Sequence, residues 1–270
     1  MKHNEFDNEE KYRLYRTVKD LLHPSISKKN ISNYKIIIND DILPLRIFYP
    51  KRVTNIEHIM LFIHGDSNIT GCHKNYAEIS STFSQEFNNL VISIDYDNYT
   101  ILPKKELNRK IYNTIKKIYK DLLNLNIKCE NITLLGDSTS ATTILTLTKK
   151  MNKENIVFGK YILFYPPVSG EYINNKIDTS YDLNLFPKLR EFYKRKRKSS
   201  FPINDTGVTL PKTLILCGNI DPLIDELREY VKIKNNTKLV EICSAKHGFL
   251  NSKDKDVINE YQDTIKNFII

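Results

Sequence analysis

Glycine and tryptophan are scarce in this sequence, with Gly 8 and Trp 0 in 270 residues. The chain also lacks any run of about 18 apolar residues, which excludes a membrane-spanning helix. Its first residues alternate between acidic and basic without an apolar core, so we expect no secretory signal. Hydrophobic residues still make up 40% of the chain, more than a disordered protein contains. These features predict a folded protein with no stable membrane insertion.

Cysteine is also sparse, and its pattern is not that of a metal or redox site. The four cysteines form no CxxC pair and have no histidine at metal-site spacing. Cys217 and Cys243 lie inside apolar runs, so we expect both to be small buried side chains. Reduced thiols of this kind favour a cytoplasmic location, and we expect no bound metal or other cofactor.

The basic excess is spread along the chain and is not concentrated in a motif. Lys+Arg 41 against Asp+Glu 32 gives a net charge of +9. A nucleic-acid-binding protein gathers its basic residues on one face or in one motif. Only residues 194–198 form such a cluster, and a short charge run is more typical of a solvated helix face or loop. We therefore expect no nucleic-acid partner.

Short apolar runs alternate with helical patterns, and this alternation predicts the fold class. The runs that predict parallel strands buried on both faces are 58–63, 90–94, 132–135, 161–165, 213–216 and 238–242. Residues 34–38 and 43–49 flank Asn39-Asp40-Asp41 and predict a hairpin. Apolar residues at helical spacing predict helices over 11–22, 107–122 and 258–268. The sequence therefore predicts an α/β protein with a mostly parallel central sheet and helices on both faces.

We expect residues 1–270 to form a single domain, because no repeat or interdomain linker interrupts the pattern. The stretch from about 168 to 210 breaks the alternation and is rich in Tyr, Lys and Pro. Together with residues 1–30, it is expected to form a small cap or lid beside a site.

Scarce glycine is retained mainly where the backbone demands it, and three glycine-containing segments stand out. The first is Gly136-Asp137-Ser138-Thr139-Ser140, between an apolar strand and a helical pattern. A serine in a strand–turn–helix is the context of a nucleophile elbow, in which a strained turn exposes the hydroxyl. The alternative is an ordinary turn in which Ser138 caps the helix.

The other two segments each place a polar residue just after a predicted strand. Asp221 follows Gly218 and precedes Pro222, which can open a helix, so Asp221 is either a site carboxylate or an N-cap. His247 follows the last predicted strand and precedes Gly248. The chain order Ser138, Asp221, His247 is the order of α/β-hydrolase triads.

Taken together, these segments resemble the α/β-hydrolase fold esterases akin to hormone-sensitive lipase, from about residue 57 to 250. The G-D-S-A-G-G elbow of that family corresponds to residues 136–141, with Ser at position 140. Its D-P-L-x-D-E segment is matched at 221–226, and its H-G-F at 247–249. Its V-S-V-D-Y stretch is similar to residues 91–96. The resemblance implies an α/β-hydrolase fold and a serine esterase.

One family motif is altered here. The H-G-G-G-F-x-x-G loop, whose N–H groups form the oxyanion hole, appears as residues 64–71. Asp66 and Ser67 stand where the family has glycine. Any residue except proline keeps its N–H donor, but a carboxylate near a developing oxyanion is unfavourable. Either the hole is rebuilt, or catalysis is weak.

The resemblance and the triad order together predict a role for each site residue. Ser138 is expected to attack an acyl carbonyl, His247 to take its proton, and Asp221 to orient the imidazole. The expected oxyanion donors are the N–H groups of Thr139, Asp66 and Ser67. Asp225, one helical turn beyond Asp221, is the reserve candidate for the acid. We expect His64 to order the oxyanion loop and not to act as a base.

Two other functions remain open at this point. The same triad suits an amidase, a formamidase or an acyltransferase. A non-catalytic hydrolase fold that binds a small molecule is the other alternative, which the altered loop favours and the intact triad disfavours. The polar 168–210 stretch predicts a small, short-acyl soluble ester as the substrate, and the sequence leaves the oligomeric state open.

Overall fold

The computed structural model describes residues 34–36, 41–50, 58–65, 73–96, 99, 102–169, 201–205 and 207–269, with side chains from 41 onward except at 73–75. The predicted helix over 11–22 and the basic cluster 194–198 lie outside these residues. So do residues 1–30, most of the 168–210 stretch, and Asp66 and Ser67.

The described residues contain one mixed sheet of eight strands in the order β1-β2-β4-β3-β5-β6-β7-β8. The strands are β1 (Tyr34–Ile36), β2 (Leu45–Phe48), β3 (Ile59–Ile63), β4 (Leu90–Ile94), β5 (Ile132–Asp137), β6 (Lys160–Phe164), β7 (Lys212–Gly218) and β8 (Thr237–Ile242). Strands β1 and β2 pair antiparallel as the predicted hairpin, and β2 pairs antiparallel with β4. Every later pairing is parallel. The mostly parallel sheet is thus confirmed.

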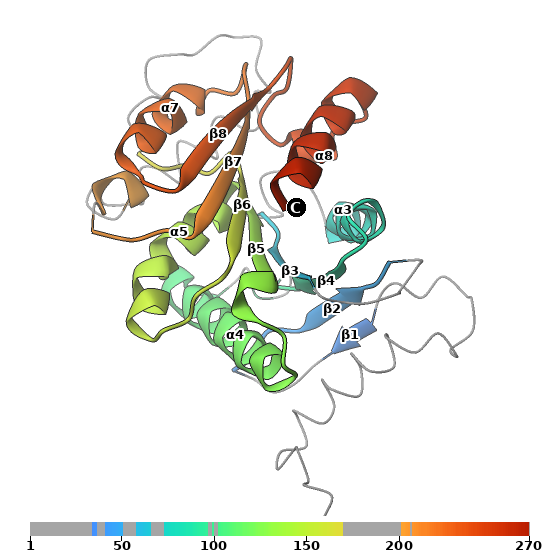
Figure 1. The fold of residues 1–270 in the computed structure, drawn as a ribbon, viewed down its shortest axis with the longest axis vertical. Helices are drawn as coiled ribbons and strands as arrows, with labels where there is room; N and C mark the ends of the chain where they lie inside the picture. Colours follow the sequence, from blue (N-terminus) through green and yellow to red (C-terminus); the bar gives the residue numbers. More distant parts are fainter. Residues whose placement is uncertain are drawn as a thin grey trace, which may run out of the picture.

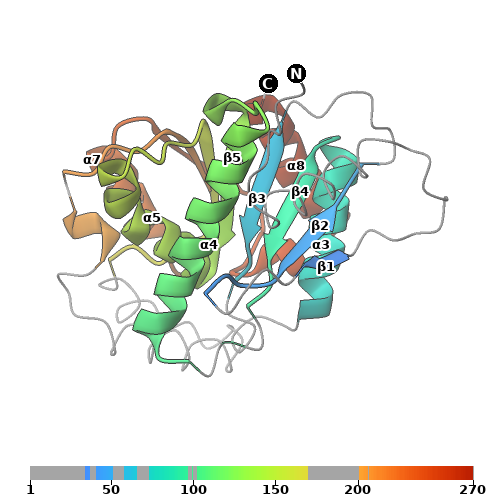
Figure 2. The same ribbon diagram turned by 90° about the horizontal axis from the view of Figure 1, so that it is seen from below.

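Helices cover both faces of this sheet. They are α3 (His73–Glu86), α4 (Lys104–Asn124), α5 (Ser138–Lys153), α7 (Ile224–Ile233) and α8 (Lys255–Ile269), with short 3-10 turns η2 (Cys129–Asn131), η5 (Pro202–Asn204) and η6 (Phe249–Asn251). Helices α3 and α8 lie on one face, and α4, α5 and α7 on the other (Figures 1 and 2). None of the described helices is both long and apolar enough to cross a membrane.

Two of the predicted helices fall inside α4 and α8, but α3 was not predicted. Its buried residues Tyr76, Ile79 and Phe83 have the i, i+3, i+7 spacing of one helical face. Most of the residues between them are polar, so few positions of the segment carry the apolar repeat. The periodic signal was therefore present in the sequence but weak.

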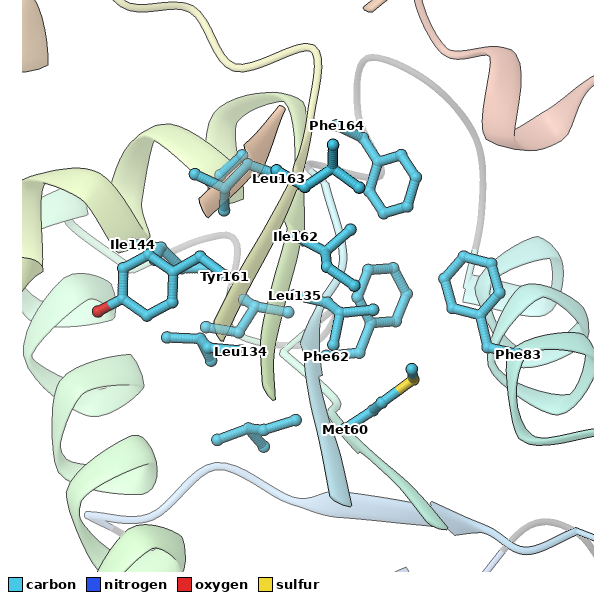
Figure 3. Close-up of a cluster of buried hydrophobic side chains, with 14 of the residues drawn as sticks. Met60, Phe62, Phe83, Leu134, Leu135, Ile144, Tyr161, Ile162, Leu163 and Phe164 are labelled. Carbon is cyan, nitrogen blue, oxygen red and sulfur yellow. The ribbon is translucent and has the colours of Figure 1, made fainter. Parts of the chain in front are cut away.

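The core consists of alternate residues of the central strands, which point to opposite faces of the sheet. Leu135 is in register with Phe62 of β3 and Ile162 of β6, and these side chains face Phe83 of α3 (Figure 3). Leu134 is in register with Tyr161, on the face covered by Ile144 of α5 (Figure 3). Burial on both faces explains why these strands read as continuous apolar runs.

Two predictions of burial are wrong at the edge of the sheet. Strand β8 is only half-buried, because it is the last of the described strands in the sheet order and its ladder partner is β7. Cys243 is exposed, since the apolar run ends with the strand at Ile242. Cys217, in the interior of β7, is buried as predicted.

Candidate active site

The carboxyl ends of the parallel strands meet at one edge of the sheet, where α/β proteins form their sites. The residues just beyond these ends are His64 after β3, Tyr96 after β4, Ser138 after β5, Tyr165 after β6, Asp221 after β7 and His247 after β8. The topology therefore brings together residues that are far apart in the sequence.

Ser138 stands at a strained turn, because β5 ends at Asp137 and α5 begins at the next residue. Its φ is +51°, in the left-handed region that serine rarely adopts. The N-cap position belongs to Asp137, so Ser138 is already the first residue of the helix. The geometry is that of a nucleophile elbow, not of an ordinary N-capping serine.

His247 bridges Ser138 and Asp221. Its Nε2 lies 3.1 Å from Ser138 Oγ, and its Nδ1 lies 2.8 Å from Asp221 Oδ2. The side chains of His247 and Asp221 are both 0% exposed, so water does not compete for these bonds. With the proton on Nδ1 donated to Asp221, Nε2 is free to accept the serine proton. This arrangement can deprotonate a serine as it attacks a carbonyl.

Asp221, and not Asp225, is the carboxylate that faces His247. Its second oxygen, Oδ1, accepts the N–H of Leu223 at 2.9 Å, which holds the carboxylate in place. The N-cap of α7 is Leu223, so Asp221 closes the turn before the helix but is not its cap. Asp225 accepts a hydrogen bond from Arg228 at 2.9 Å, on the outside of α7.

Asp137 is a buried carboxylate that was not singled out as a site residue from the sequence. Its Oδ1 accepts the N–H of Gly65 at 2.5 Å, and its Oδ2 accepts the hydroxyl of Tyr76 at 3.0 Å. Burial raises the pKa of Asp137 to about 7, although these hydrogen bonds and the nearby His247 act to lower it. The signal in the sequence that could have identified Asp137 is a charged residue just after the apolar run of a predicted strand.

Tyr165 is the second residue that was missed, and it contacts both sides of the site. Its ring lies 4.6 Å from the His247 ring, between centroids, and its hydroxyl lies 3.5 Å from Asp137 Oδ2. Its φ is +39°, a strained value for an aromatic residue. Burial and the Asp137 carboxylate raise the pKa of this hydroxyl well above its ordinary value. Tyr165 therefore acts as a neutral packing partner of the imidazole.

His64 lies in a stack of aromatic rings. It is buried, with its ring 4.3 Å from that of Tyr96 and 4.8 Å from that of Tyr76. Its Nδ1 hydrogen-bonds the carbonyl of Gly65 at 2.8 Å. These contacts agree with the predicted role in ordering the loop that follows.

One predicted oxyanion donor lies among the described residues. Thr139 is the second residue of α5, and it is half-buried beside Ser138. The N–H groups of a first helical turn have no acceptor within the helix and carry the positive end of its dipole. The Thr139 N–H is therefore suited to stabilise negative charge next to Ser138 Oγ. Asp66 and Ser67 lie outside the described residues.

In the described part of the chain, no group of three or more His, Cys, Asp or Glu side chains is arranged to hold a metal ion.

The sequence matches a known family over residues 60–251, and that family is described as the alpha/beta hydrolase fold. The match covers the elbow and both of the segments that carry Asp221 and His247. No curated protein matches the sequence.

Solved structures with the same fold are similar over nearly the whole chain. The Francisella virulence factor BioJ is 18% identical, with a TM-score of 0.72, 95% of this chain covered and 90% of that chain. The thermostable carboxylesterase EstE1, from a metagenomic library, is 19% identical, with a TM-score of 0.69 and 96% of both chains covered. The esterase LipW from Mycobacterium marinum is 14% identical, with a TM-score of 0.71, 96% of this chain covered and 87% of that chain. At these identities the likeness shows the fold.

Proposed function

The chain belongs to the α/β-hydrolase fold family, and we propose that it is a serine hydrolase of small carboxylic esters. The observation that carries the proposal is the hydrogen-bonded series from Ser138 through His247 to Asp221 at the edge of the sheet. The left-handed φ of Ser138 supports it, because a serine without a special role would relax this strain.

In the proposed reaction, Ser138 Oγ attacks the acyl carbonyl while His247 Nε2 takes its proton. The imidazolium that forms keeps its Nδ1–H bond to Asp221, whose negative charge stabilises it. His247 then gives its proton to the leaving alkoxide, and an acyl-enzyme remains on Ser138. Water, activated by the same imidazole, releases the acid and restores the serine.

The tetrahedral oxyanion needs preorganised donors, and removal of one donor typically costs about 10²–10³ in kcat. The Thr139 N–H is proposed as one donor, with the N–H groups of Asp66 and Ser67 as the others. If the Asp66 carboxylate faces the oxyanion, its field opposes the transition state and lowers turnover. We favour this arrangement, because glycine is kept at Gly65 and Gly71 but not between them.

An ester substrate is supported by the solved structures of this fold, whose names include a carboxylesterase and an arylesterase. We propose a short acyl chain on a soluble molecule, because the sequence of residues 168–210 is polar, whereas a lipase lid that contacts lipid needs a strongly apolar sequence. Amide hydrolysis and acyl transfer would use the same triad.

The test is labelling with a fluorophosphonate probe, followed by peptide mapping and by kinetics on p-nitrophenyl acetate, butyrate and a long-chain ester. We expect the label on Ser138 and faster turnover of the two short esters. Ser138→Ala should lower kcat by about four orders of magnitude or more, because the nucleophile is lost.

Ser84→Ala is the matched control, since Ser84 of α3 is also buried but its hydroxyl donates to the Asn89 carbonyl, just before the start of β4 and so at the opposite edge of the sheet. Its kcat should stay within a few-fold of the unmodified protein. A folded protein that neither takes the label nor turns over any of the esters would favour the small-molecule-binding alternative. Turnover that persists in Ser138→Ala would mean that the nucleophile is another residue.

A further inference from the structure

The peptide group that joins His64 to Gly65 is held on both sides by residues that flank Ser138. Its N–H donates to Asp137 Oδ1 at 2.5 Å. Its carbonyl oxygen accepts the hydroxyl of Ser140 at 2.5 Å. Asp137 and Ser140 are both buried, so these bonds form away from water. This peptide directly precedes the segment in which the sequence predicts oxyanion donors.

We propose that Ser140 is a positioning residue, whose hydroxyl fixes the His64–Gly65 peptide against the elbow, so that the chain enters the predicted oxyanion segment from a fixed point. The inference rests on the proposed hydrolase function and adds a determinant of its rate. Ser140 does not touch the reacting atoms in this scheme. It acts through the backbone that it holds.

The direction of the Ser140 side chain supports this role. Thr143, Thr146 and Thr148 of the same helix all donate to the carbonyl four residues earlier, which is the usual local bond of a helical hydroxyl. Ser140 is the third residue of α5, so no carbonyl of the helix lies four positions before it, and its hydroxyl binds a carbonyl 76 positions away in the sequence. Its hydroxyl therefore contributes to tertiary structure and not to the helix.

A second hydroxyl completes the arrangement around the same carbonyl. Tyr96 Oη donates to the His64 carbonyl oxygen and lies 2.9 Å from Ser140 Oγ. The Tyr96 ring also stacks on the His64 ring, with an interplanar angle of 3°. Both hydroxyl protons are then directed at the same carbonyl oxygen, so Ser140 and Tyr96 hold this carbonyl together.

The space around Gly65 shows how tightly the peptide is held. A Cβ atom added at Gly65 would lie 2.7 Å from Asp137 Oδ2 and 3.0 Å from the Tyr76 hydroxyl. Only glycine lets the backbone approach the elbow this closely. The Asp137 carboxylate on the N–H side and two hydroxyls on the carbonyl side then leave the peptide one orientation.

The family pattern has glycine where this chain has Ser140, and glycine offers no hydroxyl. In the same chain, Asp66 and Ser67 replace the loop glycines. The chain therefore has an additional hydrogen bond, from Ser140 to the His64 carbonyl, just before the altered positions 66 and 67. A displacement of oxyanion donors by about 1 Å can cost about 10² in rate, so a hydrogen bond that fixes the backbone before these donors affects turnover directly.

The experiment compares Ser140→Gly, which restores the family residue, with Ser140→Ala and Ser140→Thr. We expect the Gly and Ala variants to lose about tenfold or more in kcat on p-nitrophenyl butyrate, with KM within a few-fold, because oxyanion donors act mainly in the transition state. Ser140→Thr keeps the hydroxyl and should retain most of the activity. Thr146→Val is the matched control, because it removes a hydroxyl whose bond stays within α5.

A readout independent of activity is amide hydrogen exchange at Gly65. We expect exchange there to become about tenfold faster or more in Ser140→Gly and Ser140→Ala, since the peptide carbonyl then keeps only the Tyr96 hydroxyl of its two donors. Unchanged kcat and unchanged Gly65 exchange in Ser140→Gly would overturn the inference while the proposed function stands. A starting protein that neither hydrolyses the ester nor takes a fluorophosphonate on Ser138 would overturn the proposed function itself.

Discussion

The two sides of the candidate site are held by different kinds of contact. On the elbow side, the side chains of Asp137 and Ser140 bind the backbone of His64 and Gly65. These bonds join two strand ends that are neighbours in the sheet but distant in the sequence. The geometry of this side therefore depends on the chemical identity of individual side chains.

On the acid–base side, backbone contacts hold the segments that follow β7 and β8. The N–H of Asn219 donates to the Ile242 carbonyl at 3.0 Å, and the Asp221 N–H donates to the Gly218 carbonyl at 3.1 Å. The backbone of Gly218 passes so close to Ala245 that an added Cβ would lie 1.9 Å from its carbonyl oxygen. This side therefore depends on backbone shape and on the absence of bulk.

The difference indicates how each side fails. Both sides exclude an added methyl group, at Gly65 and at Gly218, but deleting a polar side chain that holds the backbone should disturb only the elbow side. The three residues of the proposed triad are the exception, because the proposed reaction needs the chemistry of each.

The largest effect is expected at Asp221. Asp221→Asn should lower kcat by about four orders of magnitude, because an amide favours the wrong imidazole tautomer and cannot stabilise the imidazolium. Asp225→Asn is the matched control, and it should stay within a few-fold because Asp225 binds Arg228, whereas the carboxylate bonded to His247 is that of Asp221. The measurement is kcat on p-nitrophenyl butyrate. If Asp225→Asn is the more damaging change, the two roles have to be exchanged.

A smaller effect, on stability, is expected at Asp137. Its pKa in the folded protein is raised to about 7, so the folded state holds this proton at pH values where the unfolded chain has lost it. The stabilisation is complete below the unfolded pKa, near 4, and is lost as the pH rises to about 7. Asp137→Asn has no such titration, so it should gain stability relative to the unmodified protein between pH 4 and 8.

At 1.36 kcal/mol per pKa unit, that relative gain is at most about 4 kcal/mol. Urea unfolding of both proteins at several pH values measures it. The groups that face Asp137 are Tyr76, Tyr165 and His247, so the comparison is made between matched proteins in the same buffers. A difference in unfolding free energy that stays constant from pH 4 to 8 would contradict the assignment.

The smallest effect is expected at Gly218. Gly218→Ala places a methyl group against the Ala245 carbonyl, and overpacking of this kind costs about 1–3 kcal/mol of unfolding free energy. Gly207→Ala is the matched control, because an added Cβ there meets nothing within 4 Å. Thermal unfolding measures both. Equal stability of the two variants would show that the backbone near Ala245 can shift to accommodate the methyl group without loss of unfolding free energy. The proposed contrast between the two sides would then be wrong.

Most of the strands and the three segments of the candidate site were predictable from the sequence. The apolar runs predicted the strands to within a few residues, and the glycines near Ser138, Asp221 and His247 marked the three segments that the structure brings together. Helix α3 was missed because its apolar face is narrow. The exposure of Cys243 was misjudged, since an apolar run does not reveal where an edge strand ends.

The sequence by itself determined the fold class, the elbow segment and the order of Ser138, Asp221 and His247, because these follow from local periodicity and from segments that are each contiguous. Only the tertiary structure decided which atoms meet. It placed Asp221 and not Asp225 on His247, put Tyr165 against the imidazole, and closed Asp137 and Ser140 on the His64–Gly65 peptide. Contacts between strand ends depend on the spatial order of the strands, and that order differs from their order along the chain.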